Sequence, residues 1–551
     1  MRADEREREA TARRLREWAD GARAGVLPRR EFLTLAGALG LGASGAYGLL
    51  GLAAPRPAAA QTAPQGGVLR VAMAVRPIRD PRLFTWPESA EIARQICEPL
   101  VRYRADGALE PWLLQGWETA PDASEYVLKL RPGVRWSNGD AFEAEDVLAN
   151  LRRWCDRSAF GNSMADRCAA LIDPGSGQLA DGAAEAVDAL TVKLRLVRPD
   201  VTLMASLTDY PALITHRGFD EAGGDLAATP IGTGPFEFVS LEDGARAEVK
   251  RRESGRWWGG APALDGVVWR DFGEDAEAER AAFEAGELDL TYQTTPDRAE
   301  ALEALGLIRS AAPSAETMVI RCNRAAEAFA DPRIAQAFQK AVDPQAVLEA
   351  ALNGEGATAE HHHVWTRHPE YAPAPAPTRD LNGAKRLLRA AGAKDLKVAL
   401  VSLEDGGYRK RTADAVAAQI GEAGVTVTRE TMPSRLFWNG WLTHPFSATE
   451  WRMRPLAAQT LALAYRSGAV WNESAFADPV FDALLDVALE VADLEARRVV
   501  MRRLQRRLQR SGAIIQPYWR PVIRHHAPRV KGLEAHPMLE QHFERVSLAE
   551  A

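Results

Sequence analysis

The sequence predicts an α/β fold of the mixed (α+β) kind, which is divided over more than one domain. Segments with strand and helix patterns alternate along most of the chain, which favours mixed packing over an all-helical or all-strand fold. The chain has 551 residues, too many for a single hydrophobic core. Its one low-complexity run, the alternating alanines and prolines of 372–377, predicts a stiff connector. We therefore expect two or three domains.

Strands are predicted where short apolar or alternating runs end at turn residues. They cover 68–73, 126–130, 191–196, a hairpin at 236–251, 267–269, a strand that begins at 288–290, 396–402 and 425–428. Helices are predicted where apolar residues recur at helical spacing. They cover 88–101, 144–155, 275–285, 332–352, 411–423 and a long amphipathic helix at 478–510, with Arg497, Arg498 and Arg502 on its solvent side.

The first 60 residues have the pattern of an export leader. Pro28-Arg29-Arg30-Glu31-Phe32-Leu33 precedes an apolar, glycine-rich stretch at 32–54 and the small side chains of Ala58-Ala59-Ala60. Paired arginines before such a stretch are typical of the twin-arginine export route of bacteria. We expect a mature chain that begins near Gln61 and acts in the periplasm. The alternative is an uncleaved membrane anchor, because the stretch is long enough to span a bilayer.

Net charge indicates which partners to exclude. The chain carries a formal charge of −7, and removing the leader, which has three more arginines than acidic residues, leaves −10. A soluble protein with that charge has no general attraction for nucleic acid or anionic lipid. No second long apolar run follows the leader, so nothing else in the sequence predicts a membrane span.

Four cysteines follow the leader, and two of them are candidates for a disulfide. Cys155 and Cys168 are joined by a polar, loop-like segment, and a bridge between them would stabilise the fold by roughly 3 kcal/mol in the loop-entropy model. The alternative is two free thiols, because only geometry decides. Cys97 and Cys322 lie in apolar contexts and are expected to be buried. No Cys-x-x-Cys spacing suggests a metal.

Several segments occur in an order that is specific to one family. They are Ile96 to Tyr103, Leu109-Glu110-Pro111-Trp112-Leu113 with Gly116-Trp117-Glu118, Tyr126 through Val147, Ile231-Gly232-Thr233-Gly234-Pro235-Phe236, Arg333 to Asp343, and Trp471 to Leu485. In this order the chain resembles, over about residues 66–535, the solute-binding proteins of bacterial peptide-type (dipeptide and oligopeptide) ABC importers. Most of these motif residues are glycines and prolines of turns, with an architectural role.

The resemblance implies a two-lobed periplasmic-binding-protein fold that closes around its ligand, with an accessory third domain. The first lobe would combine residues 66–106, 231–319 and 511–551, the accessory domain 107–230 and the second lobe 320–510. It also implies a function: a monomer that captures a peptide-like solute between the lobes and delivers it to an inner-membrane ABC permease, without a cofactor.

Three other functions stay open at this stage. One is the binding of an opine or another anionic small molecule. Another is an exported hydrolase, although the sequence has no G-x-S-x-G, no H-E-x-x-H and no S-x-x-K with matching partners, so we expect no enzyme. The third is a periplasmic holdase or sensor partner on the same scaffold.

The resemblance places an aromatic wall and a charged anchor in the second lobe. Trp438, Trp441 and Trp451 are the candidates for the wall, because flat aromatic faces hold extended ligands without reading side chains closely. Typical peptide binders of the family place an aspartate after a tryptophan–glycine pair to capture the ligand's ammonium group. Here Arg452 and Arg454 follow Trp451, and arginine prefers a carboxylate or phosphate. The alternative is a pair of solvent-exposed arginines.

Two further segments are expected beside the ligand. The run His361-His362-His363-Val364-Trp365 resembles a family loop at the cleft border, which makes His363 and Trp365 candidate contacts. Three adjacent histidines suggest a metal, but consecutive residues cannot easily point at one ion, so we predict a hydrogen-bonding loop and no metal. From the first lobe, Trp86 follows the first strand and is a weaker candidate.

Overall fold

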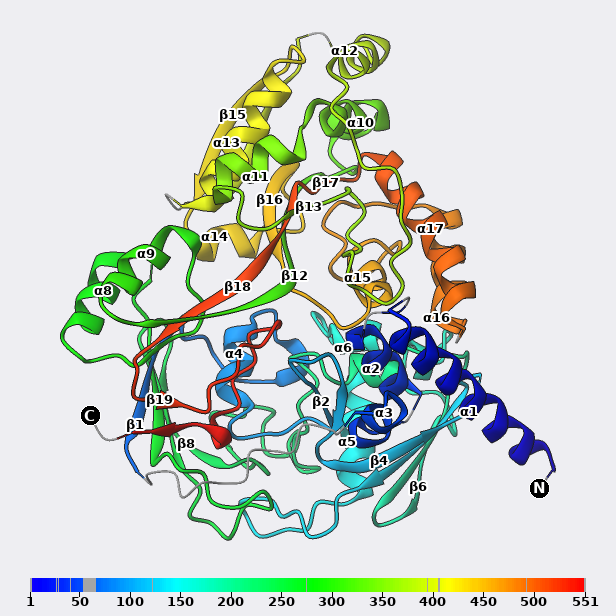
Figure 1. The fold of residues 1–551 in the computed structure, drawn as a ribbon, viewed down its shortest axis with the longest axis vertical. Coiled ribbons are helices and arrows are strands. Elements are labelled where there is room, and N and C mark those ends of the chain that lie inside the picture. The colour runs from blue at the N-terminus through cyan, green and yellow to red at the C-terminus, as the bar shows by residue number, and fades with distance from the viewer. Residues whose placement is uncertain are drawn as a thin grey trace.

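A computed structural model describes residues 2–52, apart from 26, 28 and 40, and residues 66–549, apart from 121, 274, 394, 405, 406 and 492. The mixed α/β fold class is confirmed (Figure 1). We keep the predicted division into a first lobe, an accessory domain and a second lobe as a proposal, and use these names for the elements that fall within each.

One large sheet runs through both lobes. Its order is β15-β14-β16-β12-β18-β11-β1-β10-β9-β8. The bounds are β15 Thr426–Met432, β14 Lys397–Leu403, β16 Phe446–Trp451, β12 Ile308–Cys322, β18 Tyr518–His526, β11 Leu290–Thr291, β1 Val68–Ala72, β10 Gly266–Arg270, β9 Arg246–Arg251 and β8 Phe236–Glu242. Two short strands join off this path, β13 Ala357–Thr358 on β18 and β17 Ile514–Ile515 on β12.

The long antiparallel strands β12 and β18 connect the two ends of the molecule (Figure 1). Their pairing begins at Ile308 and His526 in the first lobe and reaches Thr317 and Trp519 beside the second. The register shifts between Ala312 and Glu316, and such a bulge bends and twists a strand locally. The crossing between the lobes therefore contains an irregular segment, next to the side chain of Glu316.

The second lobe also contains helices. They are α10 Pro332–Ala341, α11 Pro344–Leu352, α12 Leu381–Ala390, α13 Tyr408–Gly421, α14 Ser434–Asn439, α15 Ala457–Ala464, α16 Pro479–Glu490 and α17 Leu494–Ser511. Helices α11 and α13 are among those beside its strands. The single helix predicted at 332–352 is wrong, because Val342 is extended and Pro344 starts a new helix that the Asp343 carboxylate caps.

The long helix predicted at 478–510 is also two helices, since Val491 is extended. Arg497 was expected in solvent but is 2% exposed, and its guanidinium lies 3.8 Å from Glu370. The helical pattern could not predict this buried partner, which lies far away in the sequence.

The accessory domain has its own sheet and core. Its sheet has the order β4-β5-β7-β6, with β4 Leu114–Thr119, β5 Glu125–Leu130, β7 Thr191–Arg195 and β6 Ala184–Asp188, beside helices α5 Ala144–Trp154, α6 Met164–Arg167 and α7 Leu203–Ser206. The alternation predicted at 191–196 is confirmed by β7. At the start of α5 the Asp146 carboxylate accepts from the Glu143 amide (2.9 Å) and the Trp136 indole (3.2 Å), which fixes the preceding turn against the helix.

The remaining elements belong mainly to the first lobe. They are α4 Pro87–Ala93, β2 Val101–Tyr103, β3 Leu109–Pro111, α8 Ala276–Glu284, α9 Pro296–Ala304, β19 Val530–Lys531 and β20 Ser547–Leu548. The hairpin at 236–251 is confirmed by β8 and β9, whereas the helix predicted at 88–101 ends early, before Pro99.

The N-terminal segment forms α1 Arg2–Arg23, α2 Arg29–Ala38 and α3 Ala43–Leu49, which pack on the body of the protein (Figure 1). Arg30 donates to the Tyr103 hydroxyl at 3.2 Å, and Glu31 pairs with Arg498 at 3.0 Å. None of the described helices combines the length and apolar character that a bilayer crossing requires. The expected cleavage region, Ala58-Ala59-Ala60 and Gln61, lies outside the described residues, as does Pro28.

Candidate functional site

A cavity of about 320 Å³ lies between the two lobes. The first lobe contributes the loop after β1 and the start of α4, and the second lobe contributes α14, the end of β16 and the segment that follows it. The lining residues are Ala74, Arg76, Thr85, Trp86, Pro87, Glu88, Tyr210, Leu403, Arg409, Ser434, Trp438, Asn439, Trp441, Glu450, Trp451, Arg452, Arg454 and Trp471. We call this cavity the cleft.

Aromatic rings form a continuous series along the cleft. Trp86 meets Trp438 edge to face across the two lobes, with ring centroids 5.2 Å apart. From Trp438 the series continues to Trp441 (5.8 Å) and on to Trp471 (6.5 Å). Trp471 in turn contacts Trp451 at 6.0 Å and stacks on Tyr210 at 6.3 Å. These rings offer a ligand large apolar faces at low conformational cost.

The structure brings six of the predicted site residues together in the cleft: Trp86, Trp438, Trp441, Trp451, Arg452 and Arg454. His363 is buried behind this lining, with its ring 5.4 Å from that of Trp451. Trp365 is 4% exposed and packs in the core of the accessory domain. His363 therefore supports the wall from behind, and neither residue lines the cleft.

Arg452 is held by carboxylates from outside its own lobe. Its guanidinium lies 2.7 Å from Glu316 on β12 and 3.2 Å from Glu88 on α4, and it also donates to Gln293 at 2.9 Å. Burial by itself would lower the pKa of Arg452, but Glu316 and Glu88 raise that pKa well above its usual value. Arg452 thus lines the cleft with its charge already compensated.

Arg454 also has a buried partner. Its Nε donates to the Asp209 carboxylate of the accessory domain at 3.2 Å, and Arg167 donates to the same carboxylate at 2.6 Å. Burial would raise the pKa of Asp209, but the two guanidinium groups lower it below the usual value. Arg454 therefore ties the second lobe to the accessory domain.

The three adjacent histidines point at three different partners. His361 Nδ1 accepts from the Gln516 amide at 2.9 Å, His362 Nε2 contacts Glu360 at 2.6 Å and His363 Nδ1 contacts the Tyr465 hydroxyl at 2.8 Å. Burial lowers the pKa of His361 to about 4 and that of His363 well below its usual value. This geometry is that of a buried hydrogen-bonding loop.

A group of side chains of the types that bind metals lies near the C-terminal end of the described chain. Ligand atoms of His536, Glu540 and His542 lie within 4.8 Å of one another. The protein itself already engages them, because His536 contacts the Tyr103 carbonyl (2.8 Å) and Glu540 pairs with Arg94 at 3.0 Å. His536 and Glu540 thus use ligand atoms for bonds within the protein.

Sequence reasoning missed several residues of the cleft: Arg76, Tyr210, Arg409 and Trp471. Trp471 belongs to a recognised motif, but its position opposite Trp441 and Trp451 follows from the fold alone. Arg76 follows β1 with no pattern that marks it, and only its surroundings in the structure make it notable.

The candidate disulfide residues are neighbours in space. Cys155 and Cys168 are buried thiols in the core of the accessory domain. A hydrogen bond to Cys155, together with burial, raises the pKa of the Cys168 thiol well above its usual value. The bridge itself stays a prediction.

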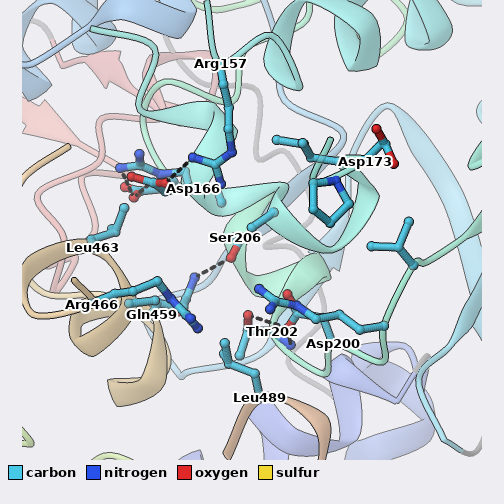
Figure 2. Close-up of a pocket in the computed structure, with 18 residues that line it drawn as sticks. Arg157, Asp166, Asp173, Asp200, Thr202, Ser206, Gln459, Leu463, Arg466 and Leu489 are labelled. Atoms are coloured by element: carbon cyan, nitrogen blue, oxygen red, sulfur yellow. Dashed lines mark hydrogen bonds and ion pairs between the residues drawn. The ribbon is translucent and has the colours of Figure 1, made fainter. Parts of the chain in front are cut away.

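A larger cavity of about 660 Å³ lies between the accessory domain and the second lobe (Figure 2). Its polar side chains are largely paired within the cavity wall, as in the contacts Arg157 to Asp166 (3.0 Å) and Gln459 to Ser206 (3.2 Å). Asp209 lies in this wall as well, so the ion pair with Arg454 separates the cavity from the cleft. We take the cleft as the functional site because, of the two cavities described for this part of the chain, the cleft has the series of aromatic faces and is bounded by both lobes.

Comparisons of the sequence with known proteins agree on one family. The family model for bacterial extracellular solute-binding proteins, family 5 Middle, matches residues 108–472. The glutathione-binding protein GsiB of Pectobacterium atrosepticum is 27% identical over 441 residues, which cover 74% of this chain and 79% of that protein. GsiB of Escherichia coli K12 is 24% identical over 398 residues, covering 67% and 73% of the two chains.

Solved structures show the same two-lobed fold. The binding protein AgaA from A. tumefaciens R10, in complex with agropinic acid, superposes with a TM-score of 0.78 at 21% identity, covering 88% of this chain and 99% of AgaA. The oligopeptide-binding protein AppA of Bacillus subtilis, in complex with a nonapeptide, has a TM-score of 0.78 at 17% identity and covers 89% and 100% of the two chains.

Proposed function

Because the chain belongs to family 5 of the bacterial extracellular solute-binding proteins, we propose that its cleft captures a peptide-like solute and delivers it to an inner-membrane ABC permease. The observation that carries this proposal is the series of aromatic rings around a cavity bounded by both lobes. The volume of about 320 Å³ lies at the lower end of the range for small-molecule pockets. It therefore favours a solute the size of a very short peptide.

Binding in this cleft needs no chemical step. The faces of Trp438, Trp441 and Trp451 would pack against the solute, with Trp86 covering it from the other lobe, and Arg452 and Arg454 would offer polar edges. Closure of the lobes excludes water, which strengthens each polar contact inside. The protein would release the same molecule that it captured.

The relatives support a peptide-like solute, since GsiB of Pectobacterium atrosepticum and of Escherichia coli is named a glutathione-binding protein. A second candidate is an opine or another anionic small molecule. The lining of the cleft favours it through Arg76. The other three arginines of the lining pair with carboxylates, whereas no ion pair of Arg76 is found among the described residues. The neighbour AgaA holds agropinic acid.

The N-terminal sequence supports a proposal for the location. We propose that the twin arginines Arg29 and Arg30 direct export to the periplasm and that the protein acts there as a monomer. The acidic net charge of −7 gives no attraction for nucleic acid.

Retention of solutes tests the proposal. The purified protein is incubated with di-, tri- and tetrapeptides, glutathione and agropinic acid, unbound solute is removed, and the retained molecules are identified by mass spectrometry. We expect one or a few solutes retained intact and a raised melting temperature, since a ligand at 100 times its Kd stabilises by about 2.7 kcal/mol. Altered products would instead assign an enzyme, and retention of nothing would contradict the proposal.

A further inference from the structure

We propose that Arg76 anchors a carboxylate of the bound solute at the end of the cleft where Trp86 meets Trp438. The inference rests on the proposed solute-binding function and adds the chemical class of the solute, a molecule with a free carboxylate at one end. Arg76 lies in the loop after β1 and lines the cleft from the first lobe.

The side chain of Arg76 is held in place by an aromatic ring and not by a carboxylate. Its guanidinium carbon lies 5.1 Å from the centroid of the Trp86 ring, and a cation–π contact of this kind orients an arginine without using its N–H groups as donors. Its Nε is buried and has no hydrogen-bond partner. In the described part of the chain no ion pair or hydrogen bond involves this guanidinium.

The other ionised side chains of the cleft all have opposite charges beside them. Arg452 and Glu88 pair with each other at 3.2 Å, and Arg454 pairs with Asp209. Arg409 pairs with Glu450 at 2.8 Å, and Arg520 reaches the same carboxylate at 3.0 Å. Among the described residues that line the cleft, Arg76 is therefore the cation left for a ligand.

The chemistry of arginine selects the ligand group. A partly buried cation without a partner is costly, and an incoming anion removes that cost. The planar fork of a guanidinium matches a carboxylate with two parallel hydrogen bonds. A ligand ammonium group at the same place would meet a like charge. The solute would accordingly bind with a carboxylate towards Trp86 and its remaining part along Trp438 and Trp441.

Peptides with free and blocked carboxyl termini test this inference. The full chain is incubated with a pool of short peptides, each present as the free acid and as the C-terminal amide, together with glutathione and a set of phosphate monoesters. The ratio of acid to amide among retained molecules is measured by mass spectrometry, and affinities of retained peptides are measured by calorimetry. We expect the wild type to prefer the acid at least tenfold.

Substitutions then assign the preference to one residue. Arg76→Gln should weaken binding of the acid by about 10- to 100-fold and change binding of the amide less than about threefold, while Arg76→Lys should keep part of the preference. Arg79→Gln is the matched control, since Arg79 lies three residues further on, is 78% exposed at its side chain and pairs only loosely with Asp225 (3.8 Å). It should behave as the wild type.

The outcomes separate the two proposals. Because Arg76 has no ion pair to lose and its cation–π contact with Trp86 is a weak interaction, the melting temperature of the ligand-free Arg76→Gln variant should lie close to that of the wild type. Equal retention of acid and amide by the wild type, or retention of phosphate esters alone, would overturn the role of Arg76 and leave the solute-binding function in place. Retention of nothing would overturn both.

Discussion

Arg452 and Glu88 meet across the cleft, with Nη2 of the arginine 3.2 Å from Oε1 of the glutamate. Glu88 lies at the start of α4 in the first lobe, whereas Arg452 follows β16 in the second. Glu316, on the crossing strand β12, holds the same guanidinium at 2.7 Å. When the lobes separate, the contact with Glu88 must break while that with Glu316 can persist. The pair is thus suited to stabilise the closed form.

Glu88→Gln should loosen that closed form. We expect a larger radius of gyration for the ligand-free variant in small-angle X-ray scattering and an affinity for solute reduced roughly fivefold, since less of the binding-competent form is populated. Glu277→Gln is the control, because Glu277 is 80% exposed at its side chain and pairs only with Arg280 on its own helix. Unchanged scattering and affinity in Glu88→Gln would show that the pair does not govern closure.

Asp209→Asn should destabilise the fold strongly. The carboxylate of Asp209 compensates both Arg167 and Arg454, and its own side chain is 2% exposed. Breaking a buried ion pair at one partner costs about 3–5 kcal/mol, because an uncompensated charge remains. Urea unfolding measures this loss. The exposed Asp414 (38%) offers a control, and Asp414→Asn should cost less than about 1 kcal/mol; a similar small loss in Asp209→Asn would contradict the account.

Parts of this architecture could be predicted from local sequence and parts could not. The alternation at 191–196 predicts β7 because one face of that strand is buried and the other is solvated. The tryptophans of the cleft could be predicted as a group because their segments resemble a family. The burial of Arg497 against Glu370 and the compensation of Arg454 by Asp209 depend on residues far away in the sequence. The same holds for Arg76, since the lack of an ion pair for it among the described residues is a property of the whole cleft.

Acidification should destabilise the protein through its buried histidines. Burial lowers the pKa of His361 from 6.5 to about 4. The folded protein therefore favours the neutral form of this side chain. The contribution of His361 to the free energy of unfolding is fully present above about pH 6.5. It is lost as the pH falls towards 4, because the unfolded chain takes up the proton first. This shift corresponds to about 3 kcal/mol. His361→Asn should reduce the loss of unfolding free energy between pH 7 and pH 4 by that amount. An unchanged pH dependence would contradict this assignment.

Cys155 and Cys168 should form a disulfide in protein purified from the periplasm. Both thiols are buried in the same core cluster of the accessory domain, and the closed loop would contribute roughly 3 kcal/mol. Peptide mapping without reductant should show the linked peptides, and a reductant should lower the free energy of unfolding. The double variant Cys155→Ala/Cys168→Ala should not respond to reductant. Two alkylated free thiols in the wild type would contradict the bridge.

Trp438→Ala should weaken solute binding with little effect on the fold. Trp438 is half-buried, and its ring contacts Trp86 and Trp441 around the cleft. Loss of an aromatic face that packs on a ligand should reduce affinity about tenfold, measured by calorimetry. Trp365→Phe, in the core away from the cleft, should leave affinity unchanged. Equal affinities of Trp438→Ala and wild type would exclude Trp438 from the site.

The most direct test of solute capture between the lobes is a crystal structure of the protein grown with a solute that it retains. Such a structure should show the intact molecule enclosed by Trp438, Trp441 and Trp451 on one side and by Trp86 on the other. A solute bound elsewhere, for example in the cavity beside Gln459 and Ser206, with an empty space between the tryptophans, would contradict it.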